Sequence, residues 1–310
     1  MQEAKYNMSL ICQTKAKLVA KDMVILINNK IKHTEAVVQE GKRVLEILGF
    51  NESCSDFVSL ALLDHDIGRF IQMRLTGTYK DYEAKEQIGI NDHGILGQML
   101  LLGELEHFPF DVRPGSIIQE QVPESDLIGH AIADIVKEHV TGFCPDEALQ
   151  ILKSDIFKNY SIEEILAFSQ KQQHDTLSAI TQIVQDIDRL DIYNQIITGR
   201  YIPPAVVDEP IPKIVMDKFY RGEYLNINLL KAQGLWNDNI GDLVKLSFIN
   251  QIRLLSVAQV IYDQDIIAKL KAIRNNPYVA REFDFAQKQL EEIIANSKDG
   301  ITVGKVKTYK

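Results

Sequence analysis

Apolar residues recur at intervals of three and four along almost the whole chain, whereas short alternating runs bounded by turn residues are nearly absent. Residues three and four apart share one face of a helix, and strict alternation marks a half-buried strand. The sequence therefore predicts an all-α fold. The expected helices cover residues 13–30, 33–48, 55–72, 93–105, 125–140, 145–153, 161–169, 175–198, 212–221, 226–233, 239–264 and 277–297.

Turn and cap residues support several of these boundaries. Gly49 follows a periodic apolar stretch and is expected to end that helix, and Ser125 is placed to cap a later one. Ser161 and Glu164 have the spacing of a capping box, in which each side chain accepts a backbone N–H of the other residue.

The strongest boundary is the segment TGRYIPPAVVDEPIP, whose four prolines forbid a continuous helix. We therefore expect two parts. Residues 1–205 would form a metal-binding catalytic domain, and residues 206–310 a helical C-terminal extension that can still pack on the same core. The extension contains no histidine and is compatible with a lid or a dimer surface.

Composition narrows the functional classes. The 310 residues are 45% hydrophobic and 25% charged, which is typical of a globular protein with a substantial core. The net charge of −9 gives no basic surplus for duplex nucleic acid or an anionic membrane, so a small anionic substrate needs a local positive centre.

The cysteines and the hydropathy point to the cytoplasm. Cys12, Cys54 and Cys144 are odd in number and lack a CxxC pair, so neither a disulfide framework nor a thiolate zinc site is indicated. There is no run of 18 apolar residues and no leader pattern at the N-terminus. We expect a soluble, unprocessed cytoplasmic protein.

All seven histidines lie in the first 174 residues, and two of them precede an aspartate. His174-Asp175 stands in the polar stretch SQKQQHDTLS and is interpreted as a solvated helix start. His65-Asp66 closes the apolar run DFVSLALLDHDIGRF, where burial without partners would cost several kcal/mol. A metal site or a hydrogen-bonded core pair would provide those partners.

Three other histidines fall on faces that are expected to be buried. His33 opens a periodic stretch, and His139 continues the stripe of Ile128, Ile132 and Ile135. His93 stands at a helix start that Asn91 or Asp92 can cap, and the nearby Gly94 and Gly97 allow close approach of another helix. The remaining two are expected elsewhere: His130, half a turn out of phase with His139, on the surface, and His107, before a proline, in a loop.

A further carboxylate is expected in the segment TQIVQDIDRLDIYNQI, which offers Asp186, Asp188 and Asp191. Helical phase places Asp191 at the centre of the apolar face and Asp188 at its margin. Periodicity alone therefore favours Asp191.

Taken in order, these motifs resemble the HD-domain superfamily of metal-dependent phosphohydrolases. The resemblance spans about half of the chain, and its pattern H…HD…H…H…D is that of the dinuclear members. It is similar to the YqeK group, which hydrolyses diadenosine tetraphosphate, and to the HD-GYP phosphodiesterases, although TGFCP replaces the GYP signature and argues against cyclic-di-GMP hydrolysis. The motifs that carry it are His33, LDHDIG (63–68), DHG (92–94), IVKEHVTG (135–142) and DIDRLD (186–191).

The resemblance implies an HD-domain helical bundle with additional C-terminal helices. It also implies a ligand set. The family's last ligand occupies the position of Asp188. Asp191 would then be a residue that contacts the metal ligands without binding the metal itself. Two divalent cations would bind, Fe or Mn foremost and Co, Ni, Zn or Mg as alternatives. Arg69 takes the place of the family's lysine and would steady a phosphate oxygen as a catalytic group beside Asp66; the alternative is a surface ion pair. The implied metal ligands are His33, His65, Asp66, His93, His139 and Asp188.

The implied function is hydrolysis of a nucleotide or related phosphate ester by a hydroxide that bridges the two ions. Two cations would also make one pocket of an acidic protein attractive to a small phosphate-containing substrate. Neither duplex nucleic acid nor membrane partners are expected, and a homodimer is compatible with the extension. Two alternatives remain: a mixed-valent di-iron oxygenase, and a catalytically inactive module that senses nucleotides.

Overall fold

The chain is all-α in the computed structural model, and no β-strand occurs in its described parts. The all-α prediction, with additional C-terminal helices, is confirmed. In the same parts of the chain, no helix combines the length and hydropathy needed to cross a bilayer. Ser125, Cys12 and His107 lie outside the described residues. These comprise residues 21–78, 81, 84, 89–90, 92–102, 127–140 and 142–297.

The chain groups into two compact units, residues 1–185 and 186–310. Their boundary lies inside helix α12 (Gln170–Ile197) and not at the prolines, because the second half of α12 bonds to the C-terminal unit. For example, the Tyr193 hydroxyl donates to the carbonyl oxygen of Lys245 at 2.8 Å. Helix α12 ends at Ile197, ahead of the prolines, and Gly199 follows with a φ of 69°. No helix resumes between the prolines, and the next one begins at Lys213. That residues 1–205 carry catalysis stays a prediction.

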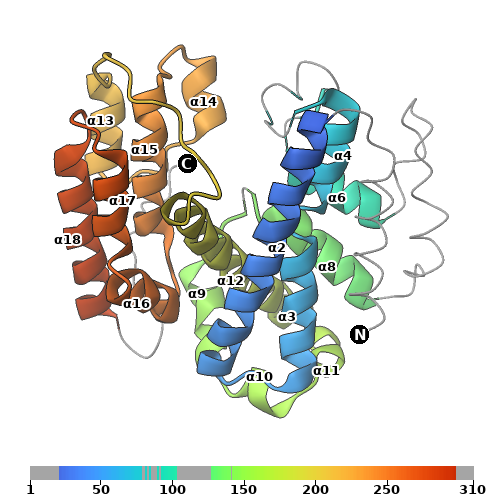
Figure 1. Ribbon diagram of the computed structural model, residues 1–310. Helices are drawn as coiled ribbons and strands as arrows, with labels where there is room; N and C mark the ends of the chain where they lie inside the picture. Colours follow the sequence, from blue (N-terminus) through green and yellow to red (C-terminus); the bar gives the residue numbers. More distant parts are fainter. Residues whose placement is uncertain are drawn as a thin grey trace. The chain divides into compact units, whose positions relative to one another are not determined.

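The first unit contains the elements that precede α12, several of which are drawn in blue and cyan in Figure 1. Helix α2 is continuous where two helices were expected with a break at residues 31–32, since neither Ile31 nor Lys32 disfavours a helix. The short helix α10 was not expected at all. The elements are α2 (Lys21–Leu48), α3 (Glu52–Asp64), α4 (Ile67–Thr76), α6 (His93–Leu101), α8 (Leu127–Glu138), α9 (Asp146–Leu149), η2 (Gln150–Lys153), α10 (Ile156–Asn159) and α11 (Ile162–Leu166).

The second unit is helical as well. The expected helix over residues 239–264 is interrupted, because the Asp186 carboxylate accepts the backbone N–H groups of Arg253 and Leu254, each at 2.8 Å. Helix α17 was missed altogether. The elements are α13 (Lys213–Tyr220), α14 (Ile227–Ala232), α15 (Asp238–Ser247), η3 (Phe248–Gln251), α16 (Leu255–Asp263), α17 (Ile266–Arg274) and α18 (Ala280–Asn296).

Helix ends follow the expected local chemistry. Gly49 adopts a φ of 71° directly after α2, a conformation that glycine reaches without steric cost. Ser161 and Glu164 form the complete capping box at the start of α11. Asp92, one of the two expected caps, accepts the N–H of Gly94 at 2.7 Å and so starts α6 at His93.

Helices α4, α6 and α8 approach each other through glycines. A Cβ atom on Gly68 would overlap the carbonyl oxygen of His93, and one on Gly94 would lie 2.5 Å from the carbonyl oxygen of Lys137. On Gly97 it would lie 2.6 Å from Cγ1 of Val136, so the expected role of Gly94 and Gly97 in close approach is confirmed. This packing brings His93, at the start of α6, next to the start of α4.

An apolar cluster fixes α2 against α4. Ile27 of α2 packs with Phe70 and Met73 of α4, and all three side chains are buried. His33 lies less than two turns after Ile27 on the same helix. The cluster therefore holds His33 close to the residues that precede α4.

We expect Gly68→Ala to destabilise the protein by about 1–3 kcal/mol, because the added methyl overlaps backbone atoms that cannot yield. Urea denaturation measures this. Gly241→Ala is the matched control: its Cβ would meet only ordinary contacts, the nearest at 3.6 Å, and alanine favours a helix interior by about 0.5–1 kcal/mol. Equal stabilities of the two variants would contradict the packing argument.

Candidate metal centre

The expected helix over residues 55–72 breaks at its two polar residues. His65 and Asp66 form the turn between α3 and α4, and they are 0% and 4% exposed. In a regular helix neighbouring side chains diverge by about 100°. Here His65 Nε2 lies 3.6 Å from Asp66 Oδ2, so the turn brings both side chains to one place.

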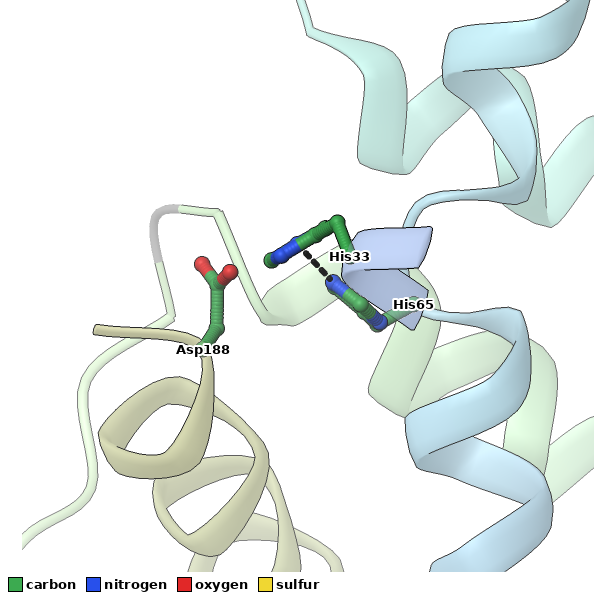
Figure 2. Close-up of side chains that lie close together, drawn as sticks. All are labelled: His33, His65 and Asp188. Atoms are coloured by element: carbon green, nitrogen blue, oxygen red, sulfur yellow. Dashed lines mark hydrogen bonds between the residues drawn. The ribbon is translucent and has the colours of Figure 1, made fainter. Parts of the chain in front are cut away.

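One oxygen of Asp66 faces a first pair of histidines. Its Oδ2 lies 3.4 Å from Nε2 of His33, which α2 supplies, and Nε2 of His33 is 3.2 Å from Nε2 of His65. Asp188, from α12, adds a carboxylate: one ligand atom from each of His33, His65 and Asp188 lies within 4.8 Å of the others. In Figure 2 the Asp188 carboxylate lies next to the His33 ring and farther from His65.

The other oxygen of Asp66 faces a second pair. Nε2 of His93 lies 3.2 Å from Asp66 Oδ1 and 3.1 Å from Nε2 of His139. Asp66, His93 and His139 form a second group whose ligand atoms lie within 4.8 Å of one another, and all three residues are buried. Asp66 thus stands between two histidine pairs, with one oxygen directed at each.

Backbone carbonyls set the direction of two imidazoles. Nδ1 of His65 lies 2.7 Å from the carbonyl oxygen of Leu62, and Nδ1 of His139 lies 2.6 Å from that of Val136. A carbonyl only accepts, so each Nδ1 carries the hydrogen and each Nε2 faces its partner histidine. Paired imidazole nitrogens beside a carboxylate oxygen are a donor set for divalent transition metals.

Electrostatics keep His139 and Asp66 in the protonation states that metal ligands need. Burial lowers the pKa of His139 to about 3, and the neighbouring His93 and His65 lower it further against the opposing effect of Asp66. His139 is therefore neutral at neutral pH. Burial alone would raise the pKa of Asp66, but Lys30, His65 and hydrogen bonds from His33 and His93 hold it well below its usual range. Asp66 is therefore ionised.

The three downstream aspartates have separate roles. Asp186 accepts the two backbone N–H groups before α16 and pairs with Arg189 at 3.1 Å. Asp191, which periodicity favours, pairs with Arg200 at 2.6 Å and accepts from Gln195 at 3.1 Å. Asp188 is the one grouped with histidines, at the position that the resemblance implies. That it binds metal stays a prediction.

Two residues that position the histidines were not predicted from the sequence. The Gln185 side-chain amide donates to the carbonyl oxygens of His139 at 3.1 Å and Gly142 at 2.9 Å, which fixes the turn that carries His139. Asp81 Oδ1 lies 3.3 Å from Nδ1 of His93, so it orients that ring from outside as carboxylates commonly do for metal-binding histidines. A polar residue on the buried face of α12 could have indicated Gln185, whereas no periodic signal surrounds Asp81.

Arg69 lies beside the second group. Its guanidinium donates to Asp81 at 2.7 Å and to Gln72 at 3.1 Å, and its Nε is 3.6 Å from Asp66 Oδ1. These contacts hold the residue that orients His93. Contact of Arg69 with a substrate phosphate stays a prediction.

The other described histidines lie apart from the two groups. His130 is exposed, as expected from its phase on α8. The side chain of His174 is 73% exposed and lies 3.7 Å from its neighbour Asp175. The two His-Asp dipeptides therefore differ in burial as their sequence contexts predict.

Comparisons of the chain with protein-family models, with curated proteins and with solved structures find no match. The resemblance to HD domains therefore depends on the motifs themselves. The functional argument depends on the geometry of the two histidine pairs around Asp66.

We expect the metal-free protein to lose stability as the pH falls below about 6.5. The pKa of His139 is about 3 in the folded chain, against about 6.5 when unfolded, so between these values the unfolded state binds more protons and acid favours unfolding. Near pH 5 the loss is about 2 kcal/mol, and Asp66, with a lowered pKa, adds to it only below about pH 4. Urea denaturation with chelator at about pH 7 and about pH 5 measures the difference.

His139→Asn is the matched variant, because its side chain does not titrate. It should lose less stability than the unsubstituted chain over the same pH interval. Identical losses in both proteins would show that His139 is not the buried neutral group.

Proposed function

We propose that the chain is a divalent-metal-dependent hydrolase of phosphoric esters or anhydrides, with a nucleotide or related phosphate compound as substrate. The observation that supports this proposal is the position of Asp66, whose two oxygens face two separate histidine pairs. A carboxylate between two donor groups is what a dinuclear site requires. The order of motifs along the chain, which resembles the dinuclear HD-domain enzymes, supports the same conclusion.

Each proposed ion has a defined set of donors. His33, His65, Asp66 and Asp188 would hold one cation, and Asp66, His93 and His139 the other. Neither set contains a cysteine, which favours Fe, Mn or another divalent ion that accepts nitrogen and oxygen over thiolate-selected metals. When bound, two such cations bind phosphoryl oxygens and lower the pKa of a water molecule.

The protein's own groups restrict the chemistry. His139 is neutral and its Nδ1 hydrogen is held by a carbonyl, so this ring is a ligand and not a proton donor. Asp66 has a pKa well below its usual range and does not take up the proton released from water. Hydrolysis by water itself needs no serine or cysteine nucleophile, in keeping with a buried Cys54 whose pKa burial raises to about 11.

Charge supports a phosphate substrate. The chain carries a net charge of −9, which disfavours a polyanion elsewhere on its surface. The two carboxylates of the ligand sets offset only half of the charge of two divalent cations, so the loaded centre would be locally positive. A small phosphate ester or anhydride fits this distribution better than duplex nucleic acid does.

In the presence of Mn²⁺ or Fe²⁺, we expect nucleotides to release inorganic phosphate, or dinucleotide polyphosphates to be cleaved into two nucleotides. His65→Ala and Asp66→Asn should each lower kcat/KM by at least about 100-fold, because metal ions supply several kcal/mol of transition-state stabilisation. Release of inorganic phosphate or of nucleotide products over a panel of these substrates measures the effect. Circular dichroism checks that each variant keeps its helices.

His174→Ala is the matched control, since it alters the exposed member of the two His-Asp dipeptides and should leave activity unchanged. Full activity in Asp66→Asn would contradict the proposal. Two bound irons without hydrolysis of any substrate would favour oxygenase chemistry instead.

A further inference from the structure

Lys30 is a charged residue at the centre that the proposed function has not used. It lies one turn before His33 on α2, so both side chains project from the same face. Its ammonium contacts Oδ2 of Asp66, the oxygen that also faces His33 and His65. The Lys30 side chain is 24% exposed against 5% for Asp66, so the lysine is the partner accessible to solvent.

The contact has different consequences with and without cations. In the protein alone, the ammonium balances the charge of a buried carboxylate, which lowers the pKa of Asp66. Once Asp66 coordinates cations, its charge is shared with them and the ammonium lies beside a centre of net positive charge. That position is unfavourable unless an anion enters.

Arg69, the other cation beside Asp66, is less suited to receive that anion. Its guanidinium already donates to Asp81 and Gln72, and its side chain is 16% exposed. Turning it toward a substrate would break the contact with the residue that orients His93. Lysine, by contrast, carries a compact charge on a flexible four-carbon stem and can change partner while its backbone stays in α2.

We propose that Lys30 binds the phosphoryl oxygens of the substrate, and that it moves from Asp66 to the substrate when the metal ions are bound. This inference rests on the proposed function for the presence of the cations and for the substrate class. It assigns the substrate-binding charge to α2, whereas the sequence motifs place it at Arg69.

The competing interpretation is that Lys30 only balances Asp66 in the metal-free protein. Removing the lysine would then raise metal affinity, because a competitor for the carboxylate is lost, and would leave phosphate binding unchanged. The two interpretations therefore differ in one measurable quantity, the phosphate affinity of the metal-loaded protein.

The test is calorimetric titration of inorganic phosphate into the full chain loaded with Mn²⁺, with the manganese content of each protein measured by elemental analysis. Lys30→Gln should weaken phosphate binding by about tenfold or more while manganese content is retained, because a hydrogen bond to a charged group is lost. Lys30→Arg should recover most of the affinity. Lys32→Gln, an exposed lysine on the same helix, should bind phosphate as the unsubstituted chain does.

Unchanged phosphate affinity in Lys30→Gln would overturn the inference, and so would an affinity that falls together with manganese content. An unsubstituted chain that binds no phosphate would overturn it as well. Because the titration needs no turnover, it separates failure of the Lys30 inference from failure of the proposed hydrolase function. Lys30-dependent phosphate binding without hydrolysis of any substrate would contradict the hydrolase and still support the role of Lys30.

Discussion

Much of the first unit is arranged around a single buried carboxylate. Asp66 is 4% exposed and ionised, and a charge in that position is tolerated only with close partners. The structure provides them on every side: His33 and Lys30 from α2, His65 from the same turn, and His93 from α6. The break between α3 and α4, and the glycine contacts that bring α6 against α4, are the structural means by which these partners reach it.

The partners are held in turn by groups further out. Carbonyl oxygens at the ends of α3 and α8 direct His65 and His139, and Asp81 directs His93. Gln185 ties α12 to the turn after α8 three residues before Asp188, so the continuous helix carries this carboxylate from an anchored position. Donor atoms held in this way lose little conformational freedom when they bind a ligand, which is the usual advantage of preorganised sites.

Sequence patterns predicted the parts of this account that depend on local chemistry. Periodicity identified the helical fold, and the Ser161 capping box and the Gly49 stop were found where they were expected. The apolar pattern continues across His65-Asp66, so it could not indicate the helix break there. Helical periodicity favoured Asp191 because a periodicity argument takes no account of partners outside the helix, such as Arg200. Asp81 and Lys30 become recognisable only when the folded chain brings them to His93 and Asp66.

The central claim is that Asp66 is shared by two metal ions, and electron paramagnetic resonance of the manganese-loaded protein tests it most directly. Two Mn²⁺ ions joined by one carboxylate are magnetically coupled, so the account predicts the spectrum of a spin-coupled pair. Asp66→Asn should abolish that coupling. A spectrum of isolated Mn²⁺ in the unsubstituted chain at full manganese loading would contradict the account.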